Sequence, residues 1–178
     1  MKAKSRKEKC VTRAPLEKWL ARALSLTMGR DSNTLDVIRF DAKTNELAAT
    51  DGRALLVVKI KSAGTLLPFN LEDGLYDLLG ETLIKSDRNR DSRFPNYANV
   101  IPFEAKEICA GDILYKILDC MTKQQVCLDI WKYESTLKTL DKFSSSWVFT
   151  NESNTSPVMM EADNEKYNVK YIIMPIKF

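Results

Sequence analysis

The chain has 178 residues, and 44% of them are hydrophobic, which is enough to bury a core as one domain or as two small ones. Its formal net charge of +3 permits binding to a polyanion without requiring it. The absence of histidine excludes Ser-His-Asp and Cys-His catalytic arrangements and leaves a conventional zinc site with few ligands.

No sequence pattern points to a membrane, a cofactor or an enzyme. No apolar run is long enough to span a bilayer, and the basic start lacks the apolar segment of a signal peptide. No glycine-rich phosphate loop is present. The four cysteines contain no Cys-x-x-Cys pair and are most simply free thiols in a reducing compartment: Cys10, Cys109, Cys120 and Cys127. We therefore expect a soluble, cytoplasmic protein that is not an enzyme and has no cofactor, no metal and no membrane partner.

Residues 1–13 form a basic tail, which is typical of a solvated terminus. Apolar residues then recur at helical spacing from Pro15 to Met28, with Pro15 suited to a first helical position and Gly29 to a stop. This pattern predicts a helix. Its polar face carries Lys18 and Arg22, one turn apart.

Three strand-like runs follow this helix, at residues 35–40, 46–50 and 54–60. Polar turns separate them, and the second turn contains Asp51-Gly52, a pair that tolerates the positive φ of a tight hairpin. A helix followed by a three-stranded meander is predicted. Beyond it we expect a strand at 66–69, a short helix at 71–79, a strand at 81–84 and a charged loop at 85–93.

The last third of the sequence predicts a second set of helices and strands. Residues 108–121 have a helical apolar face, with Asp112 available as a cap. A strand at 126–131 and a helix at 134–143 come next, and this helix carries Lys138 and Lys142 one turn apart. The remaining strands are expected at 147–150, 158–161 and 169–176.

Three short motifs resemble the bacterial DNA polymerase III beta subunit, the sliding clamp, and they occur in the order of that family. They are Ala49-Thr50-Asp51-Gly52, the connector Arg93-Phe94-Pro95-Asn96-Tyr97 through Val100-Ile101-Pro102, and Ser156–Met160 followed by Tyr171–Phe178. The resemblance implies an α+β, DNA-clamp-like fold of helix and antiparallel meander repeats. Because a complete clamp domain has more strands before the connector, we infer an abridged clamp, with a tail at 1–13, a first half plus connector at 14–102 and a second half at 103–178.

The resemblance also implies a pocket that captures short peptides from polymerases and repair proteins. Methionine can repack around Leu- or Phe-bearing peptides, which suits an apolar, partly flexible slot. Arg53 and Ala54 replace the usual histidine and arginine, and Lys177 and Phe178 replace the usual Arg-Leu ending. A last strand tucked into the core is the alternative for the tail. The matching positions are Thr50, Gly52, Leu55, Pro95, Val100, Ile172, Met174, Pro175 and Ile176.

In a clamp-like ring the helices face the enclosed duplex, so the resemblance makes Lys18, Arg22, Lys138 and Lys142 candidates for contact with DNA phosphates. Glu134 and Asp141 lie near the second pair, and an ordinary mixed surface is the alternative. Such a short chain would need several copies to close a ring, so a homo-oligomer is possible.

The leading hypothesis is a clamp-like replication or repair scaffold that associates with double-stranded DNA and tethers polymerase or repair proteins through the C-terminal groove. The alternative is an adaptor or decoy that binds clamp-binding peptides without encircling DNA. A ring predicts a defined closed oligomer, whereas an adaptor predicts a monomer or simple dimer. An enzyme using Asp36, Asp41 and Asp51 is a third interpretation, but these residues are better explained as strand-edge and turn residues.

Overall fold

The computed structural model of the chain describes residues 13–29, 35–61, 71–87, 94–102 and 106–176. The predictions for the tail at 1–12, the strand at 66–69, Arg93, and Lys177 and Phe178 lie outside the described residues. The described residues include helices and strands in both predicted halves, 14–102 and 103–178.

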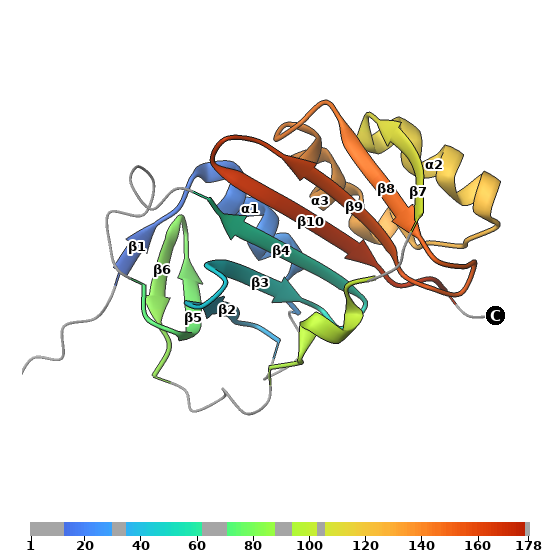
Figure 1. The fold of residues 1–178 in the computed structure, drawn as a ribbon. Coiled ribbons are helices and arrows are strands. Elements are labelled where there is room, and N and C mark those ends of the chain that lie inside the picture. Colours follow the sequence, from blue (N-terminus) through green and yellow to red (C-terminus); the bar gives the residue numbers. More distant parts are fainter. Residues whose placement is uncertain (1–12, 30–34, 62–70, 88–93, 103–105, 177–178) are drawn as a thin grey trace, which may run out of the picture.

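The described residues form one antiparallel sheet of ten strands, in the order β1-β6-β5-β2-β3-β4-β10-β9-β8-β7 (Figure 1). The fold is therefore α+β, as the sequence predicts. The strands are β1 (Arg13–Pro15), β2 (Ile38–Asp41), β3 (Glu46–Thr50), β4 (Ala54–Ile60), β5 (Gly74–Leu79), β6 (Thr82–Lys85), β7 (Lys106–Gly111), β8 (Trp147–Asn151), β9 (Val158–Asp163) and β10 (Tyr167–Ile173). The helices are α1 (Lys18–Thr27), α2 (Ile113–Gln124) and α3 (Ile130–Asp141), with a 3₁₀ turn, η2 (Tyr97–Val100).

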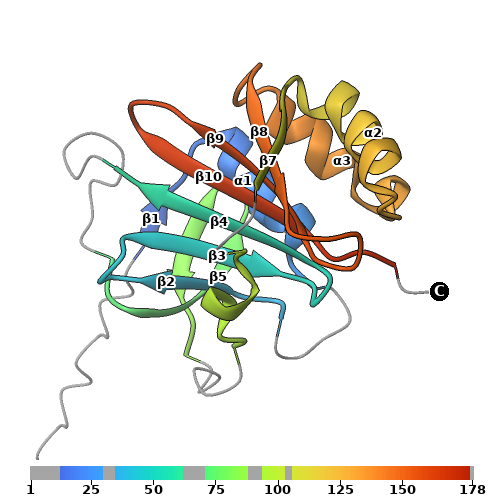
Figure 2. The same cartoon turned by 45° about the vertical axis from the view of Figure 1, so that its right-hand side comes forward.

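Two three-stranded meanders meet at the centre of this sheet (Figure 2). The meander β2-β3-β4 follows α1, and the meander β8-β9-β10 follows α2 and α3. Their last strands pair antiparallel over seven residues, from Tyr167 opposite Ile60 to Ile173 opposite Ala54. The N-terminal and C-terminal halves of the chain therefore share one continuous sheet.

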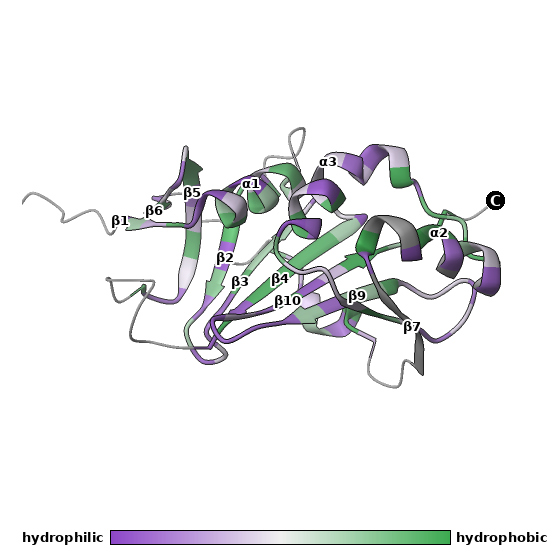
Figure 3. Cartoon of the chain, turned by 90° about the horizontal axis from the view of Figure 1, so that it is seen from above, coloured by the Kyte–Doolittle hydropathy of each residue, from purple (hydrophilic) through white to green (hydrophobic). Residues whose placement is uncertain are grey.

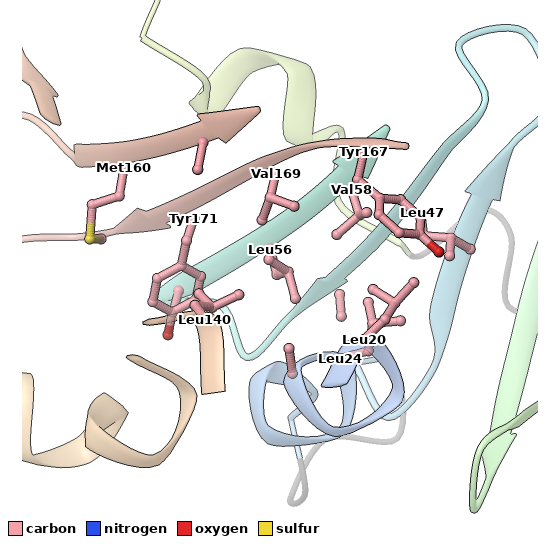
Figure 4. Packing of buried hydrophobic residues seen from close by; sticks show 14 of the residues in the cluster. Leu20, Leu24, Leu47, Leu56, Val58, Leu140, Met160, Tyr167, Val169 and Tyr171 are labelled. Carbon is pink, nitrogen blue, oxygen red and sulfur yellow. The ribbon is translucent and has the colours of Figure 1, made fainter. Parts of the chain in front are cut away.

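The larger core lies between this sheet and the three helices (Figure 3). Alternate residues of β4 and β10, such as Leu56 and Tyr171, point toward the helices, where they meet Leu24 of α1 and Leu140 of α3 (Figure 4). This alternation follows from the two-residue period of a strand. The charged residues Lys18, Arg22 and Lys138 of these helices are exposed.

A smaller core covers the opposite face of the sheet. Its buried members come from four neighbouring strands, β3, β4, β10 and β9: Ala48, Leu55, Val57, Met159 and Ile172. The connector packs over them with the partly buried side chains of Phe94, Tyr97, Val100 and Ile101. Strand β4 is consequently buried on both faces along most of its length, as is the end of β10 from Tyr171 to Ile173, which explains why these stretches are almost continuously apolar.

Two predicted elements are wrong. Residues 74–79 form strand β5, which pairs with β2 and β6, instead of the short helix predicted at 71–79. Their leucine spacing fits a helix, but tertiary pairing overrides that local preference. No strand exists at 126–131, because Asp129 caps α3 and its Oδ1 accepts a hydrogen bond from the backbone N–H of Lys132 at 3.2 Å.

Three helix boundaries also differ from the predictions. Pro15 belongs to β1, and α1 begins at Lys18 with Glu17 as its N-cap. The helix predicted at 108–121 begins only at Ile113, since residues 106–111 pair with β8. Gly29 does follow α1, yet for a packing reason: a Cβ there would lie 3.0 Å from the Cβ of Leu35. The last helix runs from 130 to 141 instead of 134 to 143.

Candidate functional site

An apolar pocket opens where the β3–β4 turn, the connector and the end of β10 meet. Its volume is about 160 Å³. Its lining comes from three segments that are far apart in the sequence: Thr50, Gly52, Arg53, Ala54, Leu55, Pro95, Tyr97, Val100, Ile172 and Met174. The pocket therefore depends on the whole fold and belongs to no single element.

Seven of the nine residues predicted for the peptide groove line this pocket. The other two, Pro175 and Ile176, follow Met174 in the tail and do not line it. The backbone N–H of Ile176 donates to the carbonyl of Cys127 at 2.8 Å, which carries this part of the tail toward the start of α3. Arg53, Ala54 and Tyr97 also line the pocket, although the predicted groove residues do not include them. Tyr97 belongs to the connector motif, and Arg53 and Ala54 are the two positions that depart from the family's usual histidine and arginine.

The β3–β4 turn is held by hydrogen bonds from its own side chains. The Thr50 hydroxyl donates to the carbonyl of Ala54 at 2.7 Å and accepts from the N–H of Gly52 at 3.0 Å. One oxygen of Asp51, Oδ1, accepts from the N–H groups of Arg53 and Ala54 at 2.9 and 2.7 Å. Gly52 has φ +87°, a conformation that favours glycine. The turn thus presents a fixed backbone to the pocket.

The C-terminal tail forms a second wall and is tied to the turn. The N–H of Met174 donates to the carbonyl of Arg53 at 2.8 Å. The Met174 side chain is 39% exposed at the pocket, although Ile172, two residues earlier, is fully buried. A flexible thioether at such an edge can adapt to different apolar side chains.

The connector forms the third wall through Pro95, Tyr97 and Val100. The Tyr97 hydroxyl donates to Oε2 of Glu46 at 3.4 Å, and its ring packs edge-on to Phe94 at 6.4 Å. Burial, together with the charges of Glu46 and Asp41, raises the pKa of Tyr97 to about 12. The hydroxyl therefore stays protonated and keeps its role as a donor.

Two residues of α3 also hold the β3–β4 turn, through the side chain of Asp51. The second oxygen of Asp51, Oδ2, lies 2.8 Å from Nζ of Lys132 and accepts a hydrogen bond from the Tyr133 hydroxyl at 3.2 Å. Burial alone would raise the pKa of Asp51, but the hydrogen bonds from Lys132 and from the Ala54 and Arg53 amides outweigh it, so that the net pKa is lowered. Asp51 is therefore ionised at neutral pH.

A second surface lies between α1 and α3, on the helical side of the sheet. It is a groove of about 780 Å³, lined by Glu17, Lys18, Trp19, Arg22, Ser135, Lys138, Thr139 and Lys142. All four cations predicted to face DNA lie along it. Their side chains are exposed, and Lys138 forms an ion pair with Glu134 at 2.5 Å. The lining contains four cations and one carboxylate, Glu17, and Glu134 pairs with Lys138 beside it, so the groove carries a net positive charge.

The structure gives the acidic residues mostly local roles. Oδ1 of Asp41 accepts from the backbone N–H groups of Lys43 and Thr44, and Asp51 holds its own turn. Among the described residues, no group of three or more cysteine, aspartate or glutamate side chains could hold a metal ion. No helix within the described ranges has the length and apolar character needed to cross a membrane.

Comparison with known proteins finds no matching family model and no matching curated sequence. Solved sliding clamps, in contrast, match the whole chain. The beta chain of DNA polymerase III from Streptococcus pneumoniae has a TM-score of 0.65 at 12% identity, with 100% of this chain and 67% of that chain covered. The Bacillus subtilis sliding clamp gives 0.61 at 13% identity, covering 100% and 67%, and the Thermotoga maritima beta subunit gives 0.61 at 14%, covering 100% and 68%. The resemblance to the sliding clamps is thus confirmed in the fold.

Proposed function

We propose that this protein is a clamp-like scaffold for DNA replication or repair, which associates with double-stranded DNA and tethers polymerase or repair proteins by binding short peptides. The observation that carries the proposal is the convergence of three distant segments on one apolar pocket. Such a pocket, with a few polar groups at its rim, suits leucine or phenylalanine side chains of an extended peptide.

The groove between α1 and α3 supports the proposed association with DNA. Its cations come from α1, from α3 and from the C-cap of α3, Lys142, and because the two helices pack against each other all four line one groove. Exposed lysine and arginine side chains of this kind bind the phosphate backbone without reading sequence. The proposed affinity is therefore independent of sequence and falls steeply with salt.

An adaptor or decoy that binds clamp-binding peptides without encircling DNA is the second candidate. The turn, the connector and the tail of this chain already form the three walls of the pocket, so peptide binding at the pocket is compatible with a protein that forms no ring. Light scattering at micromolar concentration separates the two candidates. A closed oligomer of defined size supports the scaffold, and a monomer or simple dimer supports the adaptor.

A peptide titration tests the pocket itself. The double variant Met174→Ala, Pro95→Ala removes two walls without touching the larger core, and we expect the Kd for a labelled peptide with Leu and Phe anchors to rise at least about tenfold. Fluorescence anisotropy measures the Kd, and circular dichroism checks the fold.

The matched control changes one methionine and one proline outside the pocket, as Met121→Ala, Pro157→Ala. Met121 packs on the larger core from α2, and Pro157 precedes β9. This control should bind the peptide as the wild type does. Equal affinity of wild type and the pocket variant would remove the peptide-binding proposal.

A further inference from the structure

Asp51 connects the two halves of the chain at the pocket. Its Oδ1 accepts the backbone N–H groups of Arg53 and Ala54 inside the β3–β4 turn. Its Oδ2 is held by Lys132 and Tyr133, both on α3 in the second half. One carboxylate therefore shapes the turn with one oxygen and fixes the turn to a helix with the other.

The two groups on α3 are themselves held in place. Tyr133 is 4% exposed, and its ring packs edge-on to that of Tyr171 in β10, with 6.4 Å between centroids. The Lys132 ammonium lies 5.1 Å from the centroid of the Tyr133 ring, within reach of a cation–π interaction. The position of the Tyr133 hydroxyl is thus set by the core, whereas the exposed Lys132 ammonium is held by its ion pair with Asp51 and by the Tyr133 ring.

A shift of Asp51 would move more than its own turn. The Arg53 carbonyl, one residue beyond Gly52, accepts the hydrogen bond from the Met174 N–H. Gly52, Arg53 and Ala54 line the pocket on one side, and Met174 lines it on another. Two of the three pocket walls therefore depend on where Asp51 is held.

We propose that Lys132 and Tyr133 are positioning residues for peptide binding: they lie outside the pocket lining but hold the β3–β4 turn, through Asp51, in the shape that accepts a peptide. This inference rests on the proposed function and adds to it two residues from a different half of the chain. It also makes the docking of α3 against the turn a condition for a well-formed pocket.

The test measures peptide affinity in Lys132→Met, Tyr133→Phe and the double variant. Both substitutions keep the size of the side chain and the buried ring, so the fold should survive. We expect the Kd for the Leu- and Phe-bearing peptide to rise about five- to tenfold in the double variant, because hydrogen bonds to a carboxylate are lost while contact residues stay intact. The single variant Lys132→Arg keeps a charged donor, so its Kd should stay within about twofold of wild type.

A second readout locates the effect. Amide hydrogen exchange at Arg53 and Ala54 should accelerate in the double variant, whereas exchange in β9 should not change. Lys123→Met is the control, because Lys123 is an exposed lysine of α2 that pairs with Asp119 instead of Asp51.

The possible failures are distinct. If the wild type does not bind the peptide, the proposed function falls and the positioning role falls with it. If the wild type binds and the double variant binds equally well, only the positioning role is overturned. If the Kd rises as much in Lys132→Arg as in Lys132→Met, the role assigned to the Lys132 charge is also overturned.

Discussion

The apolar pocket and the basic groove lie on opposite sides of the central strands and are built in different ways. The pocket takes its walls from three distant segments, and two of its residues, Leu55 and Ile172, are also buried core. The groove takes its cations from the exposed sides of α1 and α3, whose other sides pack on the larger core. Binding and stability should therefore be coupled at the pocket and separable at the groove.

The largest expected effect compares two adjacent leucines of β4. Leu56 is fully buried in the helix-side core, whereas Leu55, at 4% exposure, lies in the smaller core and lines the pocket. Leu56→Ala should lower the free energy of unfolding by about 3 kcal/mol, and Leu55→Ala by about 2 kcal/mol, because a cavity next to an open pocket is partly relieved. Urea denaturation measures both values.

Peptide affinity should show the opposite order. Leu55→Ala should weaken binding severalfold, and Leu56→Ala should leave the affinity of the folded fraction unchanged. If Leu56→Ala weakened binding more than Leu55→Ala, the division of β4 into a core face and a pocket face would be wrong.

An intermediate effect concerns the pH dependence of the turn. Because the folded-state pKa of Asp51 is lowered, its ionised form contributes stability that is present above the unfolded-state pKa, near about 3.9, and is lost as pH falls through the folded-state value. Asp51→Asn should cost about 1 kcal/mol at pH 7. The difference in free energy of unfolding between wild type and variant should shrink below about pH 4.

Asp163→Asn is the control for this pH dependence. The pKa of Asp163 is also lowered, chiefly by its hydrogen bond with Lys61, but this pair is at the surface, and Lys61 follows β4 at the end opposite the turn. Asp163→Asn should change the free energy of unfolding, and its pH dependence, less than Asp51→Asn does, because the pair of Asp163 and Lys61 is screened by solvent. If the difference in free energy of unfolding between wild type and Asp51→Asn stays constant from pH 7 to pH 3, the role of the carboxylate charge is contradicted.

Local sequence signals were sufficient for much of the pocket. Strands β3 and β4 have the predicted bounds, and the turn between them has the positive φ expected from Asp51-Gly52. These features follow from side-chain alternation and from turn chemistry within a few residues. The motif order then placed the connector and the tail beside the turn, which no local pattern could do.

Features decided by distant partners were missed. Segment 74–79 has helical leucine spacing and becomes a strand because β2 and β6 flank it. The hydrogen bond between Tyr133 and Asp51 joins residues 82 positions apart, and no periodicity signals it. Lys132 reads as an ordinary surface lysine until the fold brings it to the carboxylate. The sequence thus located the pocket walls but not the groups that brace them.

The smallest effect on stability is expected at the groove, where it sharpens the contrast with the pocket. Lys18→Gln with Lys142→Gln should change the free energy of unfolding by less than about 0.5 kcal/mol, because both side chains are exposed. The same variant should weaken binding to duplex DNA and reduce the slope of log K against log salt by about 1.8, since each lost phosphate contact removes about 0.9.

The control is Lys43→Gln with Lys59→Gln, which changes the net charge equally outside the groove and should leave the slope nearly intact. If both pairs of substitutions lowered the slope alike, DNA would respond to the overall charge of the protein, and the groove would have no special part in binding.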